Sequence, residues 1–260
     1  MEANIDITSM KTLILAGGLG TRFREETMLK PKPMITIGDK PILGHIFDIF
    51  VQQGLLNFVI AKGYLGNQID EWLSSFCDKK STTSDFTEFF SKDGKISIIT
   101  IDTGLNSQTG GRIKKVFEML PLKQMLVTYG DGLGNVDIRK LIKFHEKRKS
   151  VVTVTAVRPP ARFGNLKINS FGRVKKFGEK VQSESGWING GFFVIESKVT
   201  NYISSYENSF ESDSLPLIAK RRELSAYKHE GFWHPMDTIR EKELLEEYLA
   251  ETPLPWLANL

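Results

Sequence analysis

Strand-like and helix-like stretches alternate along the first half of the chain, and this alternation limits the fold more than any other feature. Repeated strand–helix–strand units indicate a mostly parallel sheet with helices on both faces. In such sheets ligands bind outside the carboxyl ends of the strands. Strand patterns are found at residues 11–16, 57–63, 95–102 and 124–131, and helix patterns at 41–54, 67–76, 110–120 and 137–149.

The pattern changes after about residue 150. The sequence predicts a strand at 150–157, a hairpin at 165–180, a strand at 187–196, and helices at 213–222 and 238–250. We expect one domain over 11–260, in which 11–150 forms a first half and 151–260 a second half that closes the cleft. Residues 1–10 are predicted to be a loose extension. Residues 77–94 show no clear period and are predicted to be a loop.

Composition excludes several classes of protein. The 260 residues are 40% hydrophobic and carry a net charge of +4, which is far from the clustered basic surface of a nucleic-acid binder. A single cysteine, Cys77, excludes an internal disulfide and fits a reducing compartment. No stretch approaches the roughly 20 apolar residues of a membrane helix. We therefore expect a cytoplasmic protein with no membrane or nucleic-acid partner.

The stretch "LILAGGLGTRFREETMLKPKP" (13–33) indicates an anion site. Glycines after a strand let the main chain approach a ligand and aim its N–H groups at phosphate oxygens. Arg22 and Lys32 add positive charge. The stretch lacks the glycine spacing of dinucleotide folds and the Gly-Lys-Ser/Thr of an ATPase loop. The alternative is a glycine-rich turn with exposed basic residues.

Two aspartates predict a metal site. Asp131 ends a strand in "YGDG", and Asp237 lies in "FWHPMDT". Mg²⁺ prefers one or two carboxylates together with substrate phosphates and water. The alternatives are a turn aspartate for Asp131 and a helix N-cap for Asp237.

Together these motifs resemble the sugar-phosphate nucleotidyltransferases. The resemblance runs from "ILAGGLGTR" and "KPKPM" through "DTG", "TGGR", "TYGDG", "AVRPPARFG" and "WINGGFFV" to "GFWHPMDT". "TGGR", "RPPARFG" and "GFWHPMDT" are typical of the cytidylyl branch. The resemblance implies a Rossmann-like mixed, mostly parallel sheet flanked by helices, of the GT-A type, with a smaller sugar-binding lobe. It places the nucleotide in the half at 11–150 and the sugar phosphate in the half at 151–260. It also implies transfer of a cytidylyl group from CTP to glucose 1-phosphate with Mg²⁺, by a homo-oligomer that in this family is often a hexamer.

The resemblance also assigns residues to the site. Arg22, Lys32, Asp131 and Lys180 are expected to be catalytic, and Asp131 and Asp237 to bind Mg²⁺. The nucleotide is expected at Leu15, Ala16, Gly17, Gly18, Leu19, Gly20, Thr21, Arg22, Lys32, Ser107, Thr109, Gly110, Arg112 and Gly130. The sugar phosphate is expected at Gly164, Glu179, Lys180, Asn189 and Gly190. The family usually has "EKP" where this chain has Glu179-Lys180-Val181, and its segment at 77–94 is longer.

Arg112 suggests how the base is selected. A guanidinium carries only donors, so it satisfies N3 and O2 of cytosine but meets the N3–H of uracil head-on. The alternative for Arg112 is an ordinary exposed arginine near the start of a helix. For the whole protein, the alternatives are a thymidylyl- or uridylyltransferase acting on another sugar 1-phosphate, and a catalytically silent ligand-sensing domain. A silent domain is expected to lose charged site residues, and this chain keeps them.

Overall fold

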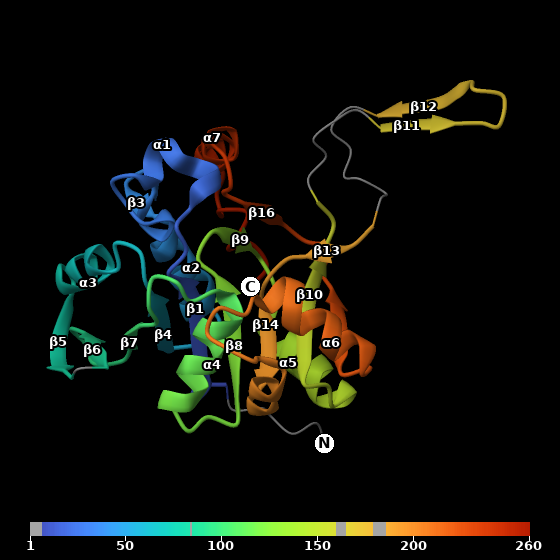
Figure 1. Cartoon of the computed structure of the whole chain (residues 1–260). Helices are drawn as coiled ribbons and strands as arrows, with labels where there is room; N and C mark the ends of the chain where they lie inside the picture. The colour runs from blue at the N-terminus through green and yellow to red at the C-terminus, as the bar shows by residue number, and fades with distance from the viewer. Residues whose placement is uncertain (1–6, 84, 160–164, 179–185) are drawn as a thin grey trace, which may run out of the picture.

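A ten-stranded sheet runs through the centre of the computed structural model, which describes residues 7–83, 85–159, 165–178 and 186–260 (Figure 1). Three two-stranded sheets, β2–β3, β9–β16 and β11–β12, lie outside it. The strands of all these sheets are β1 (Lys11–Ala16), β2 (Thr36–Ile37), β3 (Lys40–Pro41), β4 (Asn57–Lys62), β5 (Cys77–Thr82), β6 (Phe86–Ser91), β7 (Ser97–Asp102), β8 (Gln124–Tyr129), β9 (Gly132–Gly134), β10 (Val152–Val157), β11 (Asn165–Ile168), β12 (Val174–Gly178), β13 (Ile188–Asn189), β14 (Phe193–Glu196), β15 (Leu224–Lys228) and β16 (Trp233–Pro235).

Helices cover this sheet on both faces (Figure 1). The α-helices are α1 (Arg24–Thr27), α2 (Ile42–Gln52), α3 (Asn67–Ser74), α4 (Thr109–Met119), α5 (Ile138–Arg148), α6 (Leu215–Lys220) and α7 (Ile239–Glu247). Tighter or wider turns are the 3-10 helices η1 (Thr21–Phe23), η2 (Lys32–Met34), η3 (Ser197–Tyr202) and η5 (Tyr248–Ala250), and the π-helical turn η4 (Phe210–Ser214). Among the described residues no helix is long and apolar enough to cross a membrane.

The sheet is parallel at its centre and antiparallel toward its edges. Its order is β13-β10-β14-β8-β1-β4-β7-β6-β5, with β15 also paired to β10. β8, β1, β4 and β7 run parallel, whereas β14 and β6 join them antiparallel. This is the mixed α/β sheet flanked by helices that the sequence predicts. Because the four central strands are parallel, their carboxyl ends lie on one edge, where a ligand is expected.

Strand β1 shows how two cores form from one apolar run. Successive side chains of a strand point to opposite faces. Leu13 and Leu15 therefore pack in the core under α4, and Ile14 and Ala16 in the core under α2. All four are buried, since both faces of the central strands are covered by helices.

The structure differs from the sequence expectation in two irregular segments. Residues 77–94 form the antiparallel hairpin β5–β6, which extends the sheet through β7, and Thr87 and Phe89 are buried there. The end of the expected loose extension is also packed. Ile7 is 1% exposed and belongs to the main core, while the side-chain amide of Asn57 donates to the carbonyl of Thr8 at 2.6 Å. Residues 1–6 lie outside the described residues.

Candidate active site

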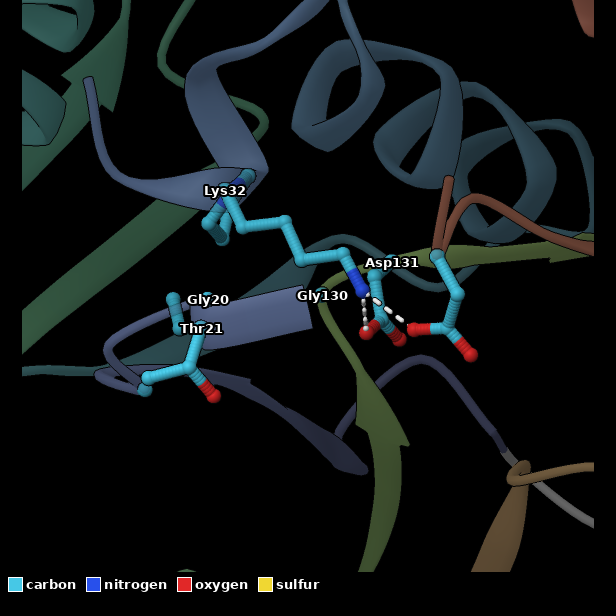
Figure 2. A pocket seen from close by; sticks show the side chains of 9 residues that line it. Gly20, Thr21, Lys32, Gly130 and Asp131 are labelled. Carbon is cyan, nitrogen blue, oxygen red and sulfur yellow. Dashed lines mark hydrogen bonds and ion pairs between the residues drawn. The ribbon is translucent and has the colours of Figure 1, made fainter. Parts of the chain in front are cut away.

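A cavity of about 270 Å³ opens at the carboxyl ends of β1 and β8. It is lined by Ala16, Gly18, Gly20, Thr21, Lys32, Pro33, Gly130, Asp131 and Asp237 (Figure 2). All of these except Pro33 belong to the site that the sequence predicts. The glycine loop and Asp131 therefore meet in one place, as the parallel topology requires, and Asp237 joins them from outside the main sheet.

Lys32 lies between the two aspartates. Its Nζ is 2.7 Å from Oδ2 of Asp131 and 2.6 Å from Oδ1 of Asp237 (Figure 2). The Lys32 side chain is 12% exposed, so burial disfavours its charge, but the two carboxylates outweigh that cost and the net effect raises its pKa. Lys32 is thus a stably charged ammonium held by two carboxylates.

A short antiparallel pairing brings Asp237 to Asp131. β16 pairs with β9, so that Pro235 faces Gly132, and the N–H of Met236 donates to the carbonyl of Asp131 at 2.8 Å. Helix α7 begins just after Asp237, but its N-cap is Thr238, whose hydroxyl accepts from the N–H of Glu241. The alternative role expected for Asp237, the helix N-cap, is therefore filled by Thr238, and the Asp237 carboxylate contacts Lys32.

The two carboxylates fit a divalent metal ion. In the described part of the chain no cluster of three or more His, Cys, Asp or Glu side chains could hold a metal. Two carboxylates open to a cavity are, however, the donor set that Mg²⁺ takes when phosphates and water complete its shell. The ammonium of Lys32 occupies the position between them, which is where the carboxylates would attract a cation.

The glycine loop contacts the cavity through its main chain. Gly20 has a φ of +63°, a left-handed conformation that favours glycine, and its position leads the chain into η1. A Cβ on Gly18 would meet nothing within 4 Å, so this residue leaves open space above the loop. A Cβ on Gly130 would lie 2.9 Å from the carbonyl oxygen of Leu15, so β8 approaches β1 as closely as glycine allows.

Arg112 lies beneath this loop, and the structure contradicts both of its expected roles. Its side chain is 3% exposed, and its guanidinium donates to the carbonyls of Gly17 (2.8 Å), Gly104 (3.0 Å) and Lys62 (3.2 Å) and to the hydroxyl of Thr103. Burial lowers its pKa, and Asp102 opposes that shift. Its terminal nitrogens are thus engaged by the carboxyl ends of β1, β4 and β7, rather than directed at a base or exposed to solvent.

The other residues predicted near the nucleotide lie around the start of α4. The Ser107 hydroxyl donates to the carbonyl of Thr103, and the Thr109 hydroxyl donates to Oε2 of Glu211 at 2.5 Å. Gly110 packs against the chain at Asn208, whose carbonyl oxygen would lie 2.7 Å from an added Cβ. None of these three lines the cavity of Figure 2. Leu15 is buried in the core, and Leu19 is 51% exposed.

Part of the predicted sugar-phosphate side is described. Asn189 ends β13, and Gly190 follows it, with its carbonyl accepting from the indole N–H of Trp233 at 2.8 Å. Gly164, Glu179 and Lys180 lie outside the described residues, as does the side chain of Arg22, whose backbone is the middle of η1. Their roles stay predictions.

Comparison with known proteins identifies the family. The model of the nucleotidyl transferase family matches residues 11–246. The chain belongs to the nucleotidyl transferase family. The chain is also 41% identical over 254 residues to the glucose-1-phosphate cytidylyltransferase of Salmonella typhimurium, covering 95% of this chain and 98% of that protein. It is 38% identical to a probable glucose-1-phosphate cytidylyltransferase of Bacillus subtilis, covering 91% and 94%.

Solved structures confirm the nucleotidyl transferase fold. HddC from Yersinia pseudotuberculosis, crystallised with GMP-PN, superposes with a TM-score of 0.67 at 23% identity and covers 92% of this chain and 99% of its own. Family substrates are a nucleoside triphosphate and a sugar 1-phosphate, and nucleotidyl transferases of this family generally use a divalent metal ion. The resemblance predicted from the sequence is therefore confirmed.

Sequence reasoning missed one residue that lines the cavity and two that contact predicted site residues. Pro33 lines the cavity, the Tyr129 hydroxyl accepts from Asn189, and Glu211 accepts from Thr109. Pro33 stands beside Lys32 in the quoted motif and could have been found there. Glu211 lies in a segment with no motif, and only the fold brings it to Thr109.

Proposed function

We propose that this nucleotidyl transferase moves a cytidylyl group from CTP to α-D-glucose 1-phosphate, giving CDP-glucose and pyrophosphate. The proposal rests on one observation, the 41% identity to the Salmonella typhimurium enzyme across nearly the full length of both chains. The cavity agrees with it, because a glycine-rich main chain, a buried ammonium and two carboxylates converge there.

The reaction needs little from a general base. A phosphate oxygen of the sugar 1-phosphate is already ionised and attacks the α-phosphorus of CTP in line. One P–O bond forms, and the bond to the leaving pyrophosphate breaks. Because the nucleophile and its target are both anionic, catalysis requires positioning and neutralisation of charge.

Described residues can supply that neutralisation. Gly18 and Gly20 line the cavity, where their main-chain N–H groups would donate to phosphate oxygens, and Lys32 provides a charged donor in the same cavity. Asp131 and Asp237 would hold Mg²⁺, which when bound neutralises charge on the phosphates. If these carboxylates held the metal ion, the ammonium of Lys32 would be available to the triphosphate. Arg22 and Lys180 complete the proposed catalytic set.

The residue assignments and the assembly are part of the same proposal. The loop from Leu15 to Arg22, together with Gly130, binds the triphosphate, and Asn189, Gly190, Gly164, Glu179 and Lys180 bind the sugar phosphate. Residues 11–150 and 151–260 form the two halves of one domain, and the protein is a homo-oligomer, with a hexamer expected from the resemblance. Light scattering on the purified chain measures the assembly.

Pyrophosphate release across a grid of substrates tests the function. The grid combines CTP, UTP, dTTP, ATP and GTP with glucose 1-phosphate and mannose 1-phosphate. We expect CTP with glucose 1-phosphate to give the highest kcat/KM. A higher value with UTP or dTTP would favour the thymidylyl- or uridylyltransferase alternative. Binding of a nucleotide with no turnover of any pair would favour a silent sensing domain.

A further inference from the structure

Glu211 connects Thr109, which the sequence predicts beside the nucleotide, with Tyr129 at the end of β8. It lies in the π-helical turn η4, in the second half of the chain. Its Oε2 accepts from the Thr109 hydroxyl at 2.5 Å, and its Oε1 accepts from the Tyr129 hydroxyl at 2.6 Å. Thr109 is the first residue of α4, and Tyr129 is the last residue of β8, two positions before Asp131.

Tyr129 extends the connection to the sugar-phosphate side. Its oxygen accepts from Nδ2 of Asn189 at 2.9 Å, while Oδ1 of Asn189 accepts from the N–H of Gly191 at 2.9 Å. Burial, followed by the neighbouring charge of Glu211, raises the pKa of Tyr129, so the phenol keeps its proton and donates it. Both contacts fix the Asn189 amide in one orientation, although the residue is exposed.

The segment that carries Glu211 is held tightly on α4. The N–H of Gly111 donates to the carbonyl of Asn208, and the N–H of Phe210 donates to the Thr109 hydroxyl at 2.9 Å. A Cβ on Gly111 would lie 1.8 Å from the carbonyl oxygen of Tyr206, so only glycine permits this approach. Glu211 therefore has little freedom to move independently of α4.

We infer that Glu211 is a positioning residue that sets the nucleotide side and the sugar-phosphate side of the cavity relative to each other. A carboxylate only accepts hydrogen bonds, so both hydroxyls must point toward it. Donation therefore runs in one direction, from Asn189 to Tyr129 to Glu211 on one side and from Thr109 to Glu211 on the other. This inference rests on the proposed function for the identity of the two substrates.

Three variants separate the arms of this network. Tyr129→Phe removes the acceptor of Asn189, so we expect KM for glucose 1-phosphate to rise by about tenfold and KM for CTP to change by less than about twofold. Thr109→Val should show the reverse. Glu211→Gln keeps the shape but places an amide N–H₂ against one of the two hydroxyl donors, and should raise both KM values.

Tyr202→Phe is the matched control, because the Tyr202 hydroxyl also donates to a glutamate, Glu223, in a hydrogen bond that shares no residue with the Glu211 network. It should change neither KM. Thermal unfolding of each variant detects loss of the fold, and calorimetric binding of CTP and of glucose 1-phosphate separately provides a readout without turnover. If Tyr129→Phe and Thr109→Val show the same KM profile, or if Glu211→Gln leaves both values unchanged, the inference is overturned.

Failure of the proposed function gives a different result. If the wild type prefers another nucleotide or sugar phosphate, the same variants are compared with that pair, and the division between the two arms is still expected. If the wild type turns over no pair, the calorimetric titrations decide. Thr109→Val should then weaken CTP binding by about tenfold while Tyr129→Phe leaves it unchanged, and equal CTP affinities for the two variants would overturn the inference.

Discussion

Gly17→Ala should destabilise the fold through Arg112. A Cβ on Gly17 would lie 2.1 Å from Nη1 and 2.4 Å from Cζ of Arg112, far inside ordinary contact. The guanidinium cannot simply swing aside, since its nitrogens donate to the ends of three strands. To make room it must give up at least two hydrogen bonds, and each such bond from a charged group contributes about 1.5–3 kcal/mol.

The expected cost is therefore about 3–6 kcal/mol, against a total stability of about 5–15 kcal/mol for a typical protein. For a chain of this size each kcal/mol lowers Tm by about 2–4 °C, so Gly17→Ala should lower it by about 6–24 °C. Gly18→Ala is the matched control, because its Cβ would meet nothing within 4 Å. Thermal and urea unfolding followed by circular dichroism measure both variants.

A double variant tests the cause. In an Arg112→Ala background the obstacle is gone, so Gly17→Ala should then cost less than about 1 kcal/mol, although Arg112→Ala itself destabilises. If Gly17→Ala unfolds within about 2 °C of Gly18→Ala, or if its cost is the same with and without Arg112, the reasoning about this guanidinium is refuted.

Three further outcomes are expected. Asp131→Asn and Asp237→Asn should each abolish pyrophosphate release, as should EDTA on the wild type, and full activity in EDTA would exclude the metal role. Lys32 has a pKa raised above the ordinary 10.5, so the stability from its ion pairs is present below pH 10.5 and is lost as pH rises through the pKa of the folded state. Urea unfolding should therefore show a loss of stability at alkaline pH in the wild type that is absent in Lys32→Met. Asp137→Ala removes the N-cap of α5 and should lower the free energy of unfolding by about 1 kcal/mol. Burial raises the pKa of Asp137, but its hydrogen bond with the N–H of Lys140 lowers that pKa on balance. The stability difference between wild type and variant should therefore be complete above the ordinary pKa of 3.8 and disappear as pH falls through the lowered pKa.

Strong periodicity explains why much of the fold could be predicted. The run at 11–16 and the helix pattern at 41–54 are each long, apolar and regularly spaced, and they become β1 and α2. The hairpin at 77–91 was missed because it is an edge element with a polar face. Only alternate residues such as Thr87 and Phe89 are buried, and a register shift in β5 interrupts the alternation.

The site could be predicted where it depends on strand ends, and could not where it depends on buried polar contacts. Asp131 and the glycine loop follow strands, so topology alone places them together. Arg112 lies near the start of a helix, where an arginine is expected to be exposed. The sequence does not show that the space left by Gly17 and Gly63 admits its guanidinium. Glu211 was missed for the same reason, since the two hydroxyls that donate to it come from separate elements, α4 and β8.

The charges of the cavity explain why acids and a lysine belong in one phosphate site. Among the described side chains that line it, two carboxylates and one ammonium sum to −2 + 1 = −1. A partly buried negative site repels a nucleoside triphosphate. A dication on the same carboxylates changes the sum to −1 + 2 = +1, which attracts it. In the proposed function the glycine loop would serve a purpose that charge alone cannot, because its N–H groups would bind phosphate oxygens at fixed positions without adding a mobile side chain. Asp131 and Asp237 are therefore consistent with an anion-binding cavity only if they recruit a metal ion, and Lys32 keeps the two carboxylates together by balancing part of their charge.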